Sequence, residues 1–326
     1  MHRFFVAPEL LQQTNNNISL PKDLAHQVRD VLHLQPGEQL TLLDNSGDEG
    51  VATIVATGKT GVDVRLLERR AGKSESNVRI ILCQGLLKSA RFEWVLEKGT
   101  ELGVAVFSPI LCRRSMAGLE DAGASKLQRW QRIIQEAAEQ SGRARLPQLL
   151  PIRPLIHALN DIPAGAIALM PWEEERTITL RDVLEGRGRP QGSPPLQSGF
   201  PQDADSSVPP RATARVPAPP HPTPALTMTD DVEAPRSHGK GGGGADVGRG
   251  PLRSPWGDSH TGPQRLSQQD QVTVVLFIGP EGGLMAEEVE LAQRYGAQAV
   301  TLGPRILRAE TAALVAVANV MYELER

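Results

Sequence analysis

The chain has few cysteines, no long apolar run and almost no net charge, and each absence excludes a class of protein. Cys83 and Cys112 are spaced like neither a zinc site nor a redox pair, so we expect both to be buried structural residues. No run of about 18 apolar residues exists, and the first residues lack the apolar core of a signal peptide. We therefore expect a soluble, cytoplasmic protein with no membrane partner and no bound metal.

The charge balance limits how the chain could meet a nucleic acid. A formal net charge of −3 over 326 residues argues against indiscriminate binding through global charge. An RNA partner would have to be held by a local basic patch. The length is sufficient for two domains with cores of their own.

Two glycine-proline loops near the end of the sequence indicate a ligand site. The β-branched run 272–278 predicts a strand buried on both faces, and it stops at the loop 279–283. A helical pattern follows, then a second apolar run at 299–302 and a second loop at 303–305. Strand, loop, helix and strand form a parallel unit, and such sheets bind ligands at the carboxyl ends of their strands.

The composition of these loops excludes two common ligand classes. Neither loop has the Lys-Ser/Thr pair that holds phosphate and magnesium in a P-loop. The first loop, GPEGG, also lacks the Gly-x-Gly-x-x-Gly spacing of dinucleotide sites. The expected ligand is therefore neither a nucleoside triphosphate nor NAD.

Five segments resemble one bacterial family. They are GPEGGL at 279–284, LGPRILRAETA at 302–312, RFFV at 3–6, EKGTELGV at 97–104 and EAAEQSGR at 136–143. In this order they resemble the 16S ribosomal RNA (uracil-N3) methyltransferases of the knotted SPOUT class, which use S-adenosylmethionine. The resemblance covers residues 1–186 and 271–326, and the two carboxyl-terminal motifs are its most specific part.

The resemblance implies an α/β fold in which a small PUA-like β-barrel domain precedes a SPOUT-type knotted, parallel-sheet methyltransferase domain. The residue patterns agree, because alternating strands are predicted near 40–42, 52–54 and 62–66, and strands alternate with helices from 72 to 186. The expected divisions are 1–71 for the barrel domain, 72–186 for the first part of the methyltransferase domain, 187–270 for an insertion, and 271–326 for the cofactor-binding knot region.

The insertion differs in kind from the rest of the chain. Residues 187–270 are rich in proline and glycine and show no hydrophobic periodicity, so we expect disorder. A long loop adds little closure entropy, and the fold can tolerate it.

Other local patterns lead to further expectations. A short helix from Pro21 should place Leu24, Val28, Val31 and Leu32 on one stripe, and a helix over 126–141 should end at Gly142. The acidic run 173–175 is either a site for the cationic part of the donor or the first turn of a helix. Met285 stands where the family commonly places a Ser or Thr cap, which should cost about 1 kcal/mol.

The resemblance assigns candidate residues to the cofactor and to the reaction. Backbone groups of the two loops would hold the adenine and ribose, between apolar walls. The candidate cofactor-binding residues are Met170, Ile278, Gly279, Pro280, Gly282, Gly283, Leu302, Gly303, Ile306, Leu307, Thr311 and Ala312. The candidate catalytic residues are Glu281 and Glu310 as bases, and Arg305 and Arg308 as cations for phosphate or the uracil oxygens. For Glu310 a structural role at the start of a helix is an equal alternative.

The RNA partner is expected to be 16S ribosomal RNA or the small ribosomal subunit. If the strands are parallel, the loops at 88–91, 113–114 and 143–145 would gather basic residues into one patch. For each of these side chains, the alternative to RNA binding is an ordinary role on the protein surface. The candidate RNA-binding residues are Arg3, His26, Arg29, Lys88, Arg91, Arg114 and Arg143.

The helix predicted over 311–322 is apolar nearly all round, so something must cover it. Burial within one subunit and a homodimer interface are the two alternatives, and the resemblance points to a homodimer. Three rival functions remain open at this point. They are a related enzyme acting on another RNA or on a ribose 2′-hydroxyl, an inactive RNA-binding homologue, and a nucleotide-binding regulator.

Overall fold

The first sheet is built from the amino-terminal strands. The residues that the computed structural model describes are 1–12, 17–59, 61–115, 123–186 and 271–325. The sheet has five strands in the order β1 (His2–Phe5), β3 (Gln39–Leu43), β4 (Asp48–Gly58), β5 (Gly61–Ala71) and β2 (Asn17–Ser19). Its inward side chains, among them Leu40, Ala52 and Val64, are almost fully buried. The three alternating strands predicted from the sequence are confirmed.

The helix predicted from Pro21 is present, but its stripe is wrong at one residue. A short helix α1 (Pro8–Leu11) precedes β2, and α2 (Lys22–His26) continues into a π-helical turn, η1 (Gln27–Val31). Val28 is fully buried, whereas Val31 is 61% exposed. The wider turn, closed by a bond from the Leu32 N–H to the Gln27 carbonyl (2.9 Å), shifts the following residues round the helix axis.

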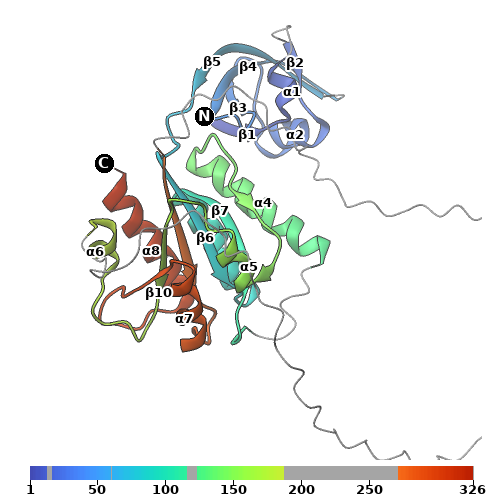
Figure 1. Ribbon diagram of the computed structural model, residues 1–326. Coiled ribbons are helices and arrows are strands. Elements are labelled where there is room, and N and C mark those ends of the chain that lie inside the picture. The colour runs from blue at the N-terminus through green and yellow to red at the C-terminus, as the bar shows by residue number, and fades with distance from the viewer. Residues whose placement is uncertain (13–16, 60, 116–122, 187–270, 326) are drawn as a thin grey trace, which may run out of the picture. The chain divides into compact units, whose positions relative to one another are not determined.

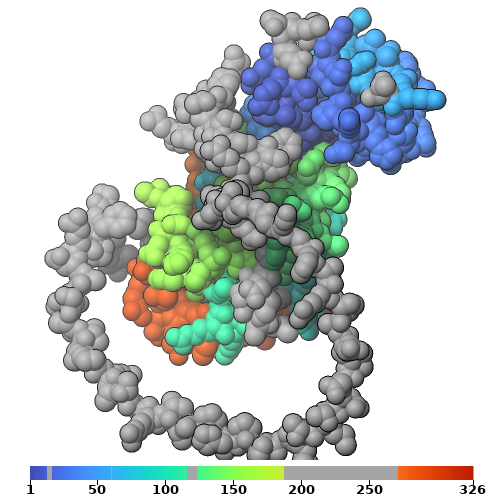
Figure 2. All heavy atoms as spheres, turned by 90° about the vertical axis from the view of Figure 1, so that its right-hand side faces the viewer, coloured from blue at the N-terminus to red at the C-terminus, as the bar shows by residue number. Residues whose placement is uncertain are grey.

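The second sheet is parallel and has seven strands (Figure 1). Its order is β12 (Gln298–Val300), β10 (Ile167–Pro171), β11 (Val272–Ile278), β6 (Val78–Gly85), β7 (Val104–Leu111) and β8 (Gln148–Leu149), and β9 (Arg153–Pro154) also pairs with β7. The central strand β11 pairs with β6 on one side and β10 on the other. In Figure 2, the orange segment that follows residue 270 lies beside the yellow-green segment that precedes residue 187. The predicted parallel arrangement is confirmed.

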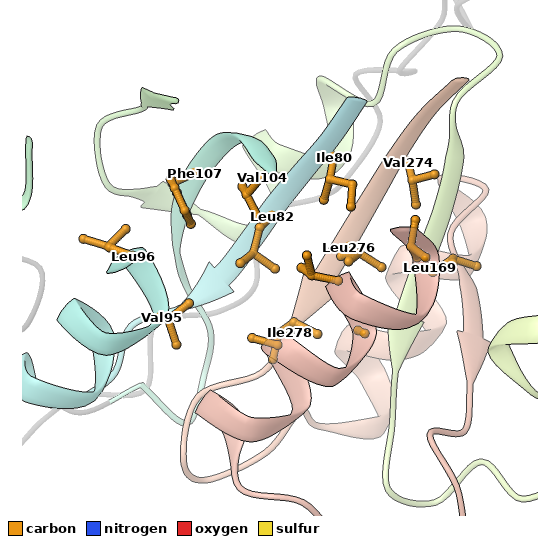
Figure 3. Packing of buried hydrophobic residues seen from close by; sticks show 14 of the residues in the cluster. Ile80, Leu82, Val95, Leu96, Val104, Phe107, Leu169, Val274, Leu276 and Ile278 are labelled. Atoms are coloured by element: carbon orange, nitrogen blue, oxygen red, sulfur yellow. The ribbon is translucent and has the colours of Figure 1, made fainter. Parts of the chain in front are cut away.

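Helices cover both faces of this sheet. One face packs on α3 (Ser89–Glu101), α4 (Ala124–Ser141), α6 (Leu180–Leu184) and α8 (Ala309–Leu324). The other face packs on α5 (Leu155–Asn160) and α7 (Ala286–Arg294). In Figure 3, Leu82 of β6 and Leu276 of β11 point toward the same apolar layer as Val95 of α3. Because the alternate residues Val275 and Phe277 are buried in the layer on the other face, β11 is apolar at nearly every position.

The long helix α4 ends as predicted, but the residue after its end does not join a surface patch. Gly142 closes the helix at φ 78°. Arg143 then donates to the carbonyls of Thr100 (3.3 Å) and Val104 (2.6 Å) and pairs with Glu75 (3.0 Å). Because α4 runs back along the sheet, Arg143 lies at the start of β7, while the other two basic loops follow strand ends. Only 6% of Arg143 is exposed, and its burial and its protein partners favour a structural role over an RNA contact.

Both cysteines are buried and free, as the sequence predicts. Burial raises the pKa of the Cys83 thiol to about 12 and raises the pKa of Cys112 as well. Within the described ranges, no helix is long and apolar enough to cross a membrane. The predicted insertion, 187–270, lies outside the described residues.

Candidate functional site

A cavity of about 210 Å³ lies where β10, β11 and β12 end. Three chain segments line it: the residues after β10, the first glycine loop with its flanks, and the second glycine loop with the start of α8. The lining residues are Pro171, Trp172, Glu173, Arg176, Ile278, Gly279, Pro280, Glu281, Gly282, Gly283, Leu284, Thr301, Leu302, Gly303, Arg305, Ile306, Leu307, Arg308, Ala309 and Ala312. The cavity is therefore at the carboxyl edge of the parallel sheet, where the sequence places it.

The first loop is fixed from beneath by the end of β6. A Cβ added to Gly85 would lie 2.5 Å from the nitrogen of Pro280, so only glycine permits this approach. Within the loop, the Gly283 N–H donates to the Pro280 carbonyl (2.9 Å), and Gly283 has φ 73°. The Arg114 guanidinium donates to the Gly282 carbonyl (2.9 Å). Arg114 thus has a loop-supporting contact at the place where the sequence predicts an RNA contact.

The second loop presents open space and unpaired cations. Gly303 has φ 118°, and a Cβ added there would meet no protein atom within 4 Å. Arg305 and Arg308 are exposed, and neither side chain has a hydrogen-bond or ion-pair partner in the described part of the chain. Ile306 between them is 77% exposed. This side of the cavity is therefore free to meet an anionic or polar ligand.

Most of the predicted cofactor and catalytic residues come together at this cavity, and three do not. Met170 is 1% exposed, packs in the apolar layer under α5 and α7, and is not part of the lining. Side chains alternate along a strand, and the residues just after Met170, Pro171 and Trp172, face the cavity instead. Thr311 and Glu310 follow the lining residue Ala309 but are not part of the lining.

Two residues of the acidic run after β10, Glu173 and Glu175, have different surroundings. Glu173 lines the cavity. Glu175 accepts hydrogen bonds from the Thr177 hydroxyl (2.6 Å) and from the backbone N–H groups of residues 176–178, which hold the pKa of Glu175 below its usual range. Glu173 and Glu175 lie in a turn, and α6 starts later, behind a capping box formed by Thr179 and Asp182. The helix-start alternative for this run is therefore wrong.

Arg91 of α3 connects the first loop to the start of α8 through one carboxylate of each. Its guanidinium lies 3.7 Å from Glu281 of the first loop and 3.6 Å from Glu310 at the start of α8. Glu281 also accepts from the Lys88 N–H (3.0 Å). The second oxygen of Glu310 is buried and has no hydrogen-bond partner among the described residues. Glu310 is thus outside the cavity lining and contacts Arg91 of α3.

Three further candidate RNA contacts, Arg3, His26 and Arg29, already have protein partners. Arg3 pairs with the buried Glu49 (2.6 Å) and donates to the Gly142 carbonyl. His26 and Arg29 both pair with Asp30, each at 2.6 Å. Arg3 is partly buried, whereas His26 remains largely exposed. These contacts favour a structural role for Arg3.

Glu288 is a supporting residue that sequence reasoning missed. Its two oxygens accept from the N–H of Met285 (2.9 Å) and from the N–H of Arg113 (2.8 Å), and only 6% of the residue is exposed. Met285 makes no side-chain cap, as predicted, and Glu288 satisfies its N–H instead. The carboxylate thereby ties the start of α7 to the loop after β7.

Replacing Glu288 by alanine should lower the free energy of unfolding by about 2 kcal/mol, because two charge-assisted hydrogen bonds to part-buried backbone N–H groups are lost. Denaturant titration measures this difference. Glu287→Ala, one residue earlier and exposed, is the matched control and should be nearly neutral. Equal stability of the two variants would contradict the supporting role of Glu288.

Comparison with known proteins identifies the family to which this fold and this cavity belong. The chain belongs to the RNA methyltransferase domain family, whose sequence profile matches residues 74–191 and 257–321. Curated relatives are called ribosomal RNA small subunit methyltransferase E. The Bacillus subtilis protein is 23% identical over 100% of this chain and 98% of its own length. The Synechocystis protein is 28% identical over 99% of this chain and 78% of its own length.

Solved structures agree with this family assignment. A ribosomal RNA small subunit methyltransferase E from Neisseria gonorrhoeae, bound to S-adenosylmethionine, is 25% identical and superposes with a TM-score of 0.66. The superposition covers 99% of this chain and 97% of that one. A putative methyltransferase from Legionella pneumophila, also in complex with S-adenosylmethionine, has the same fold, with 24% identity, a TM-score of 0.65, and coverage of 99% and 97%.

Proposed function

We propose that this chain transfers a methyl group from S-adenosylmethionine to N3 of a specific uridine in the 16S RNA of the small ribosomal subunit. One observation carries the proposal. The two glycine loops form a single cavity, in a chain whose relatives along its whole length are named ribosomal RNA small subunit methyltransferase E. The reaction takes place in the cytoplasm, where small subunits are assembled.

The cavity residues fit S-adenosylmethionine. The side chains of Ile278, Leu302 and Leu307 supply apolar walls for adenine. Gly303 leaves the space beside it open, and the indole N–H of Trp172 is a buried donor without a partner among the described residues. The carboxylate of Glu173 and the guanidinium of Arg176 are suited to the ammonium and carboxylate of an amino-acid end.

The reaction needs positioning and removal of one proton. When bound, the cofactor supplies an electrophilic methyl group on a sulfonium, and the residues around it align that group with N3 and exclude water. The imino proton of N3 must leave, and the negative charge of the uracil ring must be stabilised. Arg305 and Arg308, exposed and unpaired within the described residues, are placed to meet that charge.

The location of the two carboxylates favours different roles for them. Glu281 lines the cavity, so it is the proposed proton acceptor. Glu310 is buried and not part of the lining, and its proposed role is to hold Arg91. Arg91 is then proposed to be a positioning residue, because its guanidinium contacts the carboxylate of the first loop and the carboxylate at the start of α8.

Replacing Arg91 by glutamine should therefore raise the KM for S-adenosylmethionine about tenfold and change kcat at saturating cofactor less than about threefold. Steady-state methyl transfer at varied cofactor concentration measures both constants. Arg129→Gln is the matched control. Arg129 of α4 pairs with Glu93 of α3, the helix that also carries Arg91, and this exposed ion pair touches neither loop. A fall in kcat with unchanged KM would contradict the positioning role.

Three structural features complete the proposal. The first sheet is proposed to form a PUA-like barrel domain over 1–71 that helps to hold RNA. The remainder, 72–186 and 271–326, is proposed to be one SPOUT domain with a knot near the cofactor, interrupted by the 187–270 insertion. The exposure of Ile306 (77%), just before α8, and of Tyr322 (74%), near the carboxyl end of α8, supports a homodimer through this helix.

The experiment that tests the function identifies the methylated nucleoside. Purified small subunits from cells lacking this activity are incubated with the protein and isotopically labelled S-adenosylmethionine, and the RNA is digested to nucleosides. The label should appear in 3-methyluridine. A label in a 2′-O-methylated nucleoside would replace the proposed reaction with a ribose methylation. No label on subunits or naked RNA, despite normal cofactor binding, would indicate a different RNA substrate.

A further inference from the structure

A second cavity, of about 200 Å³, lies on the sheet face covered by α5, and it shares no lining residue with the cofactor cavity. Strand alternation produces it. Arg79, Ile81 and Cys83 of β6 point to this face, whereas Ile80 and Leu82 point to the layer under α3 and α8. A guanidinium on the interior face of a parallel strand is a departure from the apolar pattern, and it calls for a partner.

The cavity has an excess of positive charge. Arg153 of β9 lines it, pairs with Asp161, and donates from its Nε to the buried Ser108 hydroxyl (3.1 Å). Asp161 is 63% exposed and lies toward the rim. Arg79 is half-buried and has no hydrogen-bond or ion-pair partner in the described ranges. Two guanidiniums therefore face one exposed carboxylate.

No other lining group balances this charge. Burial raises the pKa of Cys83, so its thiol is neutral. Gln148 of β8 adds an amide, which can donate two hydrogen bonds. Each guanidinium has five N–H donors, and the contacts of Arg153 with Ser108 and Asp161 use only part of its set. Donors thus converge on the recess from β6, β8 and β9.

We propose that this cavity binds a phosphate group, held by Arg79, Arg153 and Gln148. Planar guanidiniums recognise phosphate oxygens through paired hydrogen bonds, and a half-buried cation gains most from such a partner. The Ser108 contact orients Arg153 in advance of binding. The site is separate from the methyl-transfer chemistry, because Arg79 is at the beginning of β6 and the cofactor loops follow the ends of the strands.

The test is calorimetric titration of the full chain with inorganic phosphate, at constant ionic strength with chloride as the exchanged anion. Saturable one-site binding is expected. Arg79→Gln should weaken it roughly tenfold or more, because one charged partner of the phosphate is removed. Arg132→Gln, an exposed arginine of α4 outside the cavity, is the matched control and should bind phosphate as the unmodified chain does.

Dimethyl phosphate, titrated in parallel, distinguishes the source of the group. Binding of both compounds identifies a phosphodiester of an RNA backbone, and binding of inorganic phosphate alone identifies a free or terminal phosphate. All variants should keep their affinity for S-adenosylmethionine, which verifies folding independently of the methylation reaction. Absence of saturable binding of either compound, or an unchanged dissociation constant in Arg79→Gln, would overturn the proposal.

Discussion

Replacing Gly303 by valine is expected to raise the Kd for S-adenosylmethionine about 100-fold while the chain remains folded. Gly303 lines the cofactor cavity at φ 118°, and a side chain there would meet ligand space rather than protein. The added methyl groups would therefore occupy part of the cavity, and the loss of about 3 kcal/mol of binding energy corresponds to that change in Kd. Equilibrium titration of the purified variant with cofactor measures it.

The control must separate backbone strain from occlusion of the cavity. Gly165 also has a positive φ, 79°, and open space around it, but it precedes β10 and lies outside the cavity. A β-branched residue at either position costs about 1–3 kcal/mol of stability. Gly165→Val should therefore lose similar stability and keep its cofactor affinity. If Gly303→Val binds the cofactor as tightly as Gly165→Val does, the cavity is not the cofactor site.

Replacing Arg308 by glutamine should lower the rate of methyl transfer about 100-fold or more, with the cofactor Kd nearly unchanged. Arg308 is exposed at the cavity and unpaired within the described chain, so its charge is available to the uracil anion. Removal of one such electrostatic contact typically costs a factor of about 10² to 10³. Single-turnover methylation of small subunits at saturating cofactor isolates this step.

Two further variants show whether the charge of Arg308 or its shape matters. Arg308→Lys keeps the charge and should recover part of the rate. Arg132→Gln removes an exposed arginine elsewhere and should leave the rate unchanged. A normal rate in Arg308→Gln would remove this residue from the reaction and leave Arg305 as the remaining cation of the loop.

The sequence predicted the parallel sheet and the position of the cavity, because both depend on local signals. The apolar run of β11 and the glycines after it are recognisable without knowledge of their neighbours. The grouping of Arg143 with the other basic loops could not be judged from local signals. Its partners, Glu75 and the carbonyls of Thr100 and Val104, come from distant parts of the chain, and only the direction of α4 brings them together.

Errors of one or two residues separate the predicted site from the observed cavity. Met170 and Pro171 are neighbours, yet strand alternation buries the first and exposes the second to the cavity. Glu310 was left with two alternatives, and its contact with Arg91 of α3 favours the structural one. Glu288 had no recognisable signal beyond its position in the first turn of a helix, since its second partner is the distant Arg113.

Reverse transcription of 16S RNA tests the central claim most directly. A methyl group on N3 blocks the pairing edge of uracil, so reverse transcriptase should stop one nucleotide before the modified base. Small subunits from cells lacking this protein are treated with the purified chain, with and without S-adenosylmethionine. The account predicts one stop at a uridine that requires both the chain and the cofactor. Absence of any stop, from a preparation that binds the cofactor normally, would contradict methylation at N3.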